Sequence, residues 1–189
     1  MKIVITRSFV AITLAAVVFA GCSKKAAAPK GETKVTVPCS GPDYFTTSKF
    51  FRANSIGESS DQVTSKRKAL SNARNELAQA IQTTVKTVTD NYVNSREMNN
   101  REEVEERFES LNREVVDQTL SGIRTICEEL MKTEQGNFKT YIAIELSADE
   151  LVNKYNERLS KDERLKIDYD YEKFKETFDK EMAKMGKGN

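Results

Sequence analysis

Histidine is absent from this 189-residue sequence, so its reactive side chains are carboxylates, tyrosines and three cysteines. Histidine is the commonest general base and a frequent zinc ligand, and without it a Ser-His-Asp triad and the usual zinc sites are excluded. The sequence also has no glycine-rich phosphate loop and no nucleophile elbow. One alternative that stays open is an enzyme that acts through carboxylates or through Tyr141 and Tyr155, such as a carboxylate-dependent hydrolase.

Acidic residues gather at two places. The first cluster consists of Glu102, Glu103, Glu105, Glu106 and Glu109, interleaved with Arg101, Arg107 and Arg113. Its carboxylates could bind a divalent cation, but the arginines would neutralise them, so we expect surface ion pairs. The second cluster consists of Asp168, Tyr169, Asp170, Tyr171 and Glu172. It is similar to carbohydrate sites, but it also suits the start of a helix, and we expect no catalytic pair, metal ion or cofactor at either cluster.

The amino terminus has the pattern of a secretory signal. Lys2 and Arg7 precede an almost unbroken apolar run from Phe9 to Ala20, and small residues follow. A basic segment, a short apolar segment and small residues at the cut are typical of such signals. The apolar run is too short to span a membrane comfortably. We therefore expect residues 1–21 to be removed.

The four residues Phe19-Ala20-Gly21-Cys22 resemble the lipobox of bacterial lipoproteins. The resemblance implies that the Cys22 sulfur receives a diacylglyceryl group, that the signal is cut before Cys22, and that the new amino group is acylated, for example with palmitate. Phe19 departs from the leucine most common at its position. Acyl chains contribute about 0.8 kcal/mol per buried methylene and would tether the protein to a membrane. The alternative is an ordinary secretory signal that leaves a free cysteine.

Residues 22–43 form the expected lipidated terminus and a flexible tether. From Ser23 to Thr36 the chain has few large apolar residues and cannot offset the entropy of ordering. By resemblance to Gram-negative lipoproteins, Ser23 stands where an aspartate would retain the protein in the inner membrane. The resemblance therefore implies the outer membrane, and Lys24 and Lys25 favour its periplasmic face over the cell surface.

Cys39 and Cys127 are the two cysteines left after lipidation of Cys22. In an oxidising periplasm such a pair predicts a disulfide. Closing this loop contributes about 4 kcal/mol in the chain-entropy model. The alternative is a reactive thiol such as Cys127, although no histidine is present to lower its pKa.

The longest regular element is a helix predicted over residues 60–92. Its buried stripe, at steps of three or four residues, consists of Leu70, Ala73, Leu77, Ile81, Val85, Val88 and Tyr92. A strand from Phe50 to Ile56, ending at Gly57, comes before it, and we expect Ser59 or Ser60 to cap the helix. A second helix is predicted over residues 102–118.

A change of period after Ser121 and Gly122 predicts a β-hairpin over residues 123–132 and 138–146. One side of its second strand should face the core: Phe138, Thr140, Ile142, Ile144 and Leu146. A capping box over residues 147–150 begins a third helix. Near the end, Phe174, Phe178, Met182 and Met185 form a stripe that could pack on the domain or dock a partner helix.

These elements predict an α+β fold, in which a small three-stranded antiparallel sheet packs against the long helix. The expected order is β-α-α-β-β-α, followed by a C-terminal helix. We expect one domain over residues 44–160 and a charged C-terminal helix and tail over residues 161–189. The net charge is +1, or −1 once Lys2 and Arg7 leave with the signal, so the charge gives no reason to expect binding to nucleic acid.

Residues 50–146 resemble the LPP-twenty family of bacterial outer-membrane lipoproteins. The resemblance rests on Phe51-Arg52-Ala53, the segment from Gly57 to Asp61, and the helix residues Ala69, Ala73-Arg74 and Leu77-Ala78. It implies a helix-on-sheet fold in which helix alanines let the sheet approach closely, and it implies no catalytic residues.

We therefore expect a non-enzymatic, membrane-tethered interaction or assembly module of the cell envelope. It would bind the membrane through its lipid and an envelope protein that the sequence does not identify. The further alternative is a lipid- or small-molecule-binding lipoprotein with a groove between helix and sheet.

Overall fold

The computed structural model describes residues 31, 33, 35–95, 101–162 and 169–187, and every structural statement below concerns these residues. The chain divides after Val35, and the described helices and strands belong to the unit Thr36–Asn189. The predicted signal, Asp168, and residues 22–30 (including Cys22), 32 and 34 of the predicted lipidated terminus and tether lie outside the described residues. Within the part described, no helix is long and apolar enough to cross a membrane.

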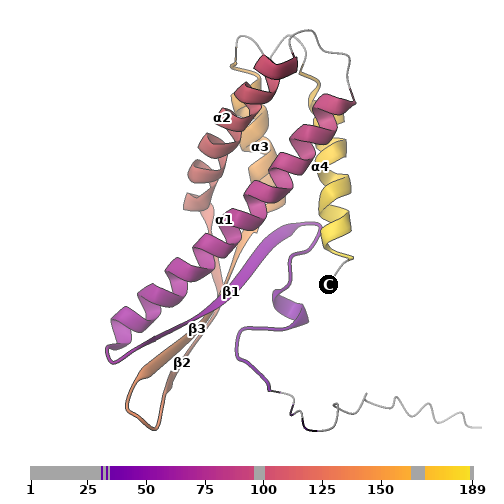
Figure 1. Cartoon of the computed structure of the whole chain (residues 1–189). Coiled ribbons are helices and arrows are strands. Elements are labelled where there is room, and N and C mark those ends of the chain that lie inside the picture. The colour runs from indigo at the N-terminus through magenta and orange to yellow at the C-terminus, as the bar shows by residue number, and fades with distance from the viewer. Residues whose placement is uncertain (1–30, 32, 34, 96–100, 163–168, 188–189) are drawn as a thin grey trace, which may run out of the picture. The chain divides into compact units, whose positions relative to one another are not determined.

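The second unit has the predicted α+β fold (Figure 1). Its elements are a 3-10 turn at Pro42–Tyr44, β1 (Phe50–Ser59), α1 (Gln62–Asn94), α2 (Arg101–Thr119), a second 3-10 turn at Leu120–Gly122, β2 (Arg124–Lys132), β3 (Phe138–Ser147), α3 (Ala148–Leu159) and α4 (Tyr171–Met185). The strands form one antiparallel sheet in the order β1-β3-β2. The predicted hairpin is β2 and β3, and β1 joins it on the β3 side.

The long helix α1 has the predicted stripe, of which all members but the half-buried Leu70 are fully buried. Its cap is different from the predicted Ser59 or Ser60. The carboxylate of Asp61 accepts a hydrogen bond from the Thr64 N–H at 2.8 Å. The prediction was wrong because β1 continues through Ser59, so the chain turns into the helix later than expected.

Gly57 does not end its strand, because β1 runs past it to Ser59. Its role is the close approach of α1, since a Cβ at this position would collide with the backbone O of Ser65 and the backbone N of Ala69. The Ser65 hydroxyl lies 2.9 Å from the Gly57 carbonyl and 2.8 Å from the Thr140 hydroxyl. Helix and sheet therefore meet here with no side chain of Gly57 between them.

The sheet lies along the first half of α1, and α2, α3 and α4 gather around its second half (Figure 1). Aromatic rings join these helices: Tyr92 and Phe174 lie 5.5 Å apart, and Phe174 stacks on Tyr155 at 5.6 Å. The stripe of α4 is part of this core, with Phe174, Phe178 and Met182 buried. Of the two possibilities for that stripe, packing on the domain is the one observed.

Strand β3 is buried on both faces over its second half, which the alternating pattern did not indicate. Thr140, Ile142, Ile144 and Leu146 are buried as predicted, but Ala143 and Glu145 on the opposite face are buried too. The segment before β1 covers part of that face, where Cys39 Sγ lies 3.7 Å from the carbonyl oxygen of Tyr141. Burial there depends on a segment about a hundred residues distant in sequence.

Candidate interaction surface

Strand β2 is the part of the sheet that the rest of the unit leaves uncovered. Every residue of β2 except the half-buried Cys127 is exposed. Three of the exposed side chains are large and apolar, namely Ile126 (36%), Leu130 (44%) and Met131 (42%). Clustered apolar side chains on an exposed strand are typical of interaction sites.

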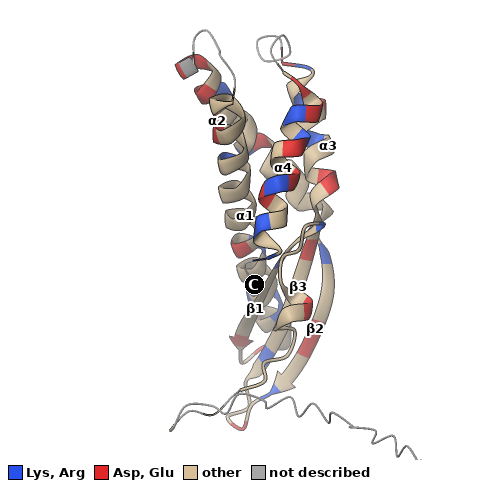
Figure 2. Cartoon of the chain, turned by 90° about the vertical axis from the view of Figure 1, so that its right-hand side faces the viewer, with Lys and Arg blue, Asp and Glu red and all other residues tan. Residues whose placement is uncertain are grey.

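The position of α1 explains this exposure. The helix packs on β1 and β3, and Figure 2 shows β2 on the side of the sheet farther from α1. The ammonium of Lys66 reaches from α1 to the Glu128 carboxylate at 2.8 Å. Glu128 and Leu130 pair with Ile142 and Thr140, so they lie on the same face of the sheet as α1. They are nevertheless exposed, because the helix does not extend over β2.

The outer edge of β1 is blocked by side chains. The Thr46 hydroxyl oxygen accepts a hydrogen bond from the Arg52 N–H at 3.0 Å and lies 3.2 Å from the Arg52 carbonyl oxygen. Asn72 donates to the Ile56 carbonyl at 3.5 Å, and Lys68 donates to the Glu58 carbonyl at 3.1 Å. These contacts occupy backbone groups that another strand would need.

The outer edge of β2 has no such cover. In the part of the chain that the structure describes, no side chain hydrogen-bonds to the β2 backbone, and β3 is its neighbour on one side alone. Alternate N–H and C=O groups of β2 therefore face solvent. An edge of this kind is a template for strand addition, in which backbone groups supply affinity and neighbouring side chains supply specificity.

Cys39 and Cys127 form the predicted disulfide, with their Cα atoms 5.5 Å apart. It fastens the segment before β1 to β2, and Cys39 adopts a left-handed backbone with φ of 52°. The Glu129 carboxylate lies within 4.8 Å of both sulfurs, but sulfurs bonded to each other provide no thiolate ligand for a metal ion. The alternative of a reactive thiol at Cys127 does not apply to this disulfide-bonded state.

The start of β2 is held by a charged cluster on the outer face of the sheet. The buried Glu145 carboxylate pairs with Arg52 at 3.0 Å and with Arg124 at 2.8 Å. Both guanidinium groups lie over the Phe50 ring, at 5.5 Å and 5.9 Å. A register shift between Thr125 and Cys127 follows, so the regular open edge runs from Cys127 to Lys132.

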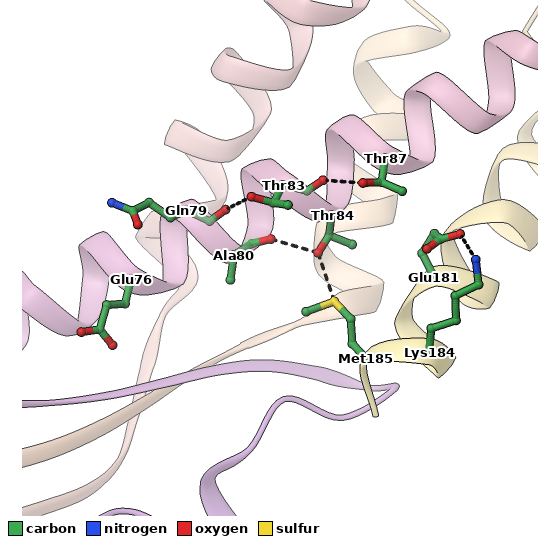
Figure 3. A pocket seen from close by; sticks show the side chains of 9 residues that line it. All are labelled: Glu76, Gln79, Ala80, Thr83, Thr84, Thr87, Glu181, Lys184 and Met185. Atoms are coloured by element: carbon green, nitrogen blue, oxygen red, sulfur yellow. Dashed lines mark hydrogen bonds and ion pairs between the residues drawn. The ribbon is translucent and has the colours of Figure 1, made fainter. Parts of the chain in front are cut away.

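A groove of about 500 Å³ lies between α1 and α4 (Figure 3). The hydroxyls of Thr83, Thr84 and Thr87 each donate to the backbone carbonyl four residues earlier, and Thr84 also contacts the Met185 sulfur. The donors of these threonines are used within the protein, so they leave their methyl groups to the groove, which Glu76, Glu181 and Lys184 also line. The groove between helix and sheet that the ligand-binding alternative required is closed at Gly57 by the α1 backbone.

The predicted acidic clusters belong to helices. Asp170 caps α4 by accepting a hydrogen bond from the Lys173 N–H at 3.1 Å, and the Tyr169 ring packs 6.4 Å from Tyr92. In the first cluster, Arg107 pairs with Asp162 beyond α3 at 2.9 Å. Asp170 thus marks the helix start that the sequence indicated, whereas Arg107 pairs with an acidic residue outside its own cluster.

Tyr141 and Tyr155 do not share a site. The Tyr155 hydroxyl donates to the Asn112 side chain within the core, and burial raises the pKa of this phenol. Tyr141 lies on the face of β3 opposite to Thr140 and Ile142. The two phenols that the enzyme alternative named are thus directed to different parts of the unit.

The open edge of β2 was not recognised from the sequence. The sequence of Arg124–Lys132 does contain an indication of it, because charged residues occur on both faces of the strand. A covered strand would have at least one apolar face. No family model matches this chain, and no curated protein matches it either.

Proposed function

We propose that this chain is a lipid-anchored protein of the Gram-negative outer membrane that acts as an interaction or assembly module on the periplasmic face and catalyses no reaction. The Cys22 motif supports the anchor, and the resemblance to LPP-twenty lipoproteins supports the compartment. The observation that carries the proposal is the open β2 edge with its exposed Ile126, Leu130 and Met131.

The edge supports binding of a protein in particular. A partner strand would satisfy the solvent-facing backbone groups of β2 and cover its apolar side chains at once. Leu130 and Met131 point to opposite faces, so a strand lying beside them could contact both. The opposite edge, with Thr46, Asn72 and Lys68 bound to it, could not accept a strand without losing these bonds.

The disulfide joins β2 to the segment that follows the proposed tether. The chain between Cys22 and Cys39 spans at most about 60 Å when fully extended. Because Cys39 is bonded to Cys127, the tether joins the folded unit at β2 itself. A partner bound at β2 would thereby be held within reach of the membrane.

Photo-crosslinking in intact envelopes tests the proposal. A photoreactive residue at Met131 should form a discrete adduct, because this side chain lies at the open edge. The matched control is the same residue at Lys86, which is exposed on α1 away from β2. Mass spectrometry of the adduct identifies the partner. Equal adducts from both positions, or none from Met131, would refute the proposal.

The α1–α4 groove favours one second candidate function, the binding of a small apolar ligand. Its volume of about 500 Å³ lies within the range of known ligand pockets. Native mass spectrometry of the protein extracted in mild detergent should then show a bound molecule that Ala80→Phe removes by filling the groove. Protein that is empty before and after the substitution would rule this candidate out.

A further inference from the structure

We infer that the occupant of the open edge is a second copy of this chain, whose β2 pairs antiparallel with the first across a two-fold axis at Leu130. The two sheets would then continue as one. This inference rests on the proposed role of β2 as the interaction site, and it adds the identity and register of the partner.

Symmetry limits the possible registers. A two-fold axis perpendicular to the sheet places the α1 helices of both copies on the same face of the joined sheet. In an antiparallel pair, two residues directly opposite each other also point to the same face. The pairing with β3 shows which face of the sheet each side chain of β2 lies on. The face that α1 covers carries Glu128, Leu130 and Lys132, and the opposite face carries Cys127, Glu129 and Met131. The axis must therefore pass through one residue and its own copy.

Charge excludes most of these registers. An axis at Glu128, Glu129 or Lys132 would place a charged side chain opposite its own copy. An axis at Met131 would place Lys132 opposite Leu130 and would form no opposite-charge pair within the strand. Like charges directly opposite each other destabilise an antiparallel pair. Axes at Cys127 or earlier would run through the register shift between Thr125 and Cys127.

The axis at Leu130 gives opposite-charge pairs and an apolar pair on the side of α1 and brings no like charges together. It sets Glu128 of each copy opposite Lys132 of the other, so two opposite-charge pairs form. Leu130 meets its own copy on the side of α1, where its side chain is now 44% exposed. On the outer side, Met131 lies opposite Glu129. On the side of α1, the sequence of β2 is thus self-complementary in charge about Leu130.

The ends of the strand limit this pairing to the regular stretch. Arg124 is held by Glu145, and the register shift beside Ile126 interrupts the ladder. Strand twist increases at such shifts, which would turn the second copy away from the start of β2. We therefore expect the paired segment to extend from Cys127 to about Thr133.

Charge reversal tests the register. Lys132→Glu places the new carboxylate of each copy opposite Glu128 of the other copy, so the dimer contains two repulsive pairs. The dissociation constant of the dimer should therefore rise roughly tenfold. Combining it with Glu128→Lys restores both opposite-charge pairs in reversed order and should restore the affinity. The matched control is Lys187→Glu, which changes the net charge as much as Lys132→Glu does but at an exposed position beyond α4. It should leave dimerisation unchanged.

The measurement is sedimentation velocity of the full chain in detergent over a dilution series, with a melting curve for each variant to verify folding. Leu130→Cys provides a second readout, because a cysteine on the axis should give a covalent dimer under oxidation, whereas Val63→Cys on α1 should not. A wild-type chain that stays monomeric, or a double variant no tighter than Lys132→Glu, would overturn the inference. In that event, a Met131 adduct with another protein would leave the interaction function standing.

Discussion

The backbone of Gly57 in β1 lies directly against the backbone of Ala69 in α1, with no space for a Cβ between them. The contact is completed by Ser65, whose hydroxyl lies 2.9 Å from the Gly57 carbonyl. This crossing fixes α1 over β1 and β3 and thereby leaves β2 uncovered. The exposed face of β2 is thus a consequence of where the helix approaches the sheet, while its open edge follows from the strand order β1-β3-β2.

Gly57→Ala should destabilise the fold by about 1 to 3 kcal/mol, because the added methyl group collides with the Ser65 and Ala69 backbones. Urea unfolding followed by circular dichroism measures the change. Asn54→Ala in the same strand is the control and should cost less, since Asn54 is on the other face. Equal stability of wild type and Gly57→Ala would contradict the close approach.

Loss of the disulfide should lower the free energy of unfolding by about 4 kcal/mol, since the bond joins residues 88 positions apart. The comparison is between wild type and the double variant Cys39→Ser/Cys127→Ser in urea. Thiol titration of the denatured, unreduced wild type should find neither Cys39 nor Cys127 reactive. Two reactive thiols would show that the bridge does not form.

Asp61→Ala should lower the melting temperature at neutral pH, because it removes the cap of α1. Hydrogen bonds from the Thr64 side chain and from its N–H hold the pKa of Asp61 below the usual 3.8. A lowered pKa stabilises the fold above pH 3.8, and this contribution is lost as the pH falls through the pKa of the folded state. The difference from wild type should therefore shrink in acid. Ser60→Ala, at a position first expected to cap the helix, should melt like wild type.

Cys22→Ala should release the protein from membranes into the soluble fraction, because it removes the proposed site of lipidation. Fractionation with immunoblotting measures the distribution. The Cys39→Ser/Cys127→Ser variant is the control and should stay with the membrane, since it keeps Cys22. A Cys22→Ala protein that still sediments with membranes would argue against the anchor.

Local patterns in the sequence were sufficient for the elements. The stripe from Ala73 to Tyr92 predicted α1, the alternation from Thr140 to Leu146 predicted β3, and the capping box at Ser147 predicted the start of α3, where Ser147 accepts from the Glu150 N–H. Each pattern depends on residues a few positions apart. The pairing of Cys39 with Cys127 followed because the third cysteine was assigned to a lipid.

Exposure could not be derived in this way, because it depends on which elements pack together. The strand Arg124–Lys132 has an apolar content that would also suit a covered strand. Its side chains are nevertheless exposed, because α1 crosses the sheet at Gly57. Ala143 is covered by a segment that precedes β1, which no period within β3 could indicate. The sequence alone thus determined the helices and strands through short-range periodicity, and the cysteine pair through the number of cysteines. The tertiary structure decided the strand order, which leaves β2 at an edge, and the approach of α1 to Gly57, which leaves the face of β2 uncovered; both depend on contacts between residues far apart in the sequence.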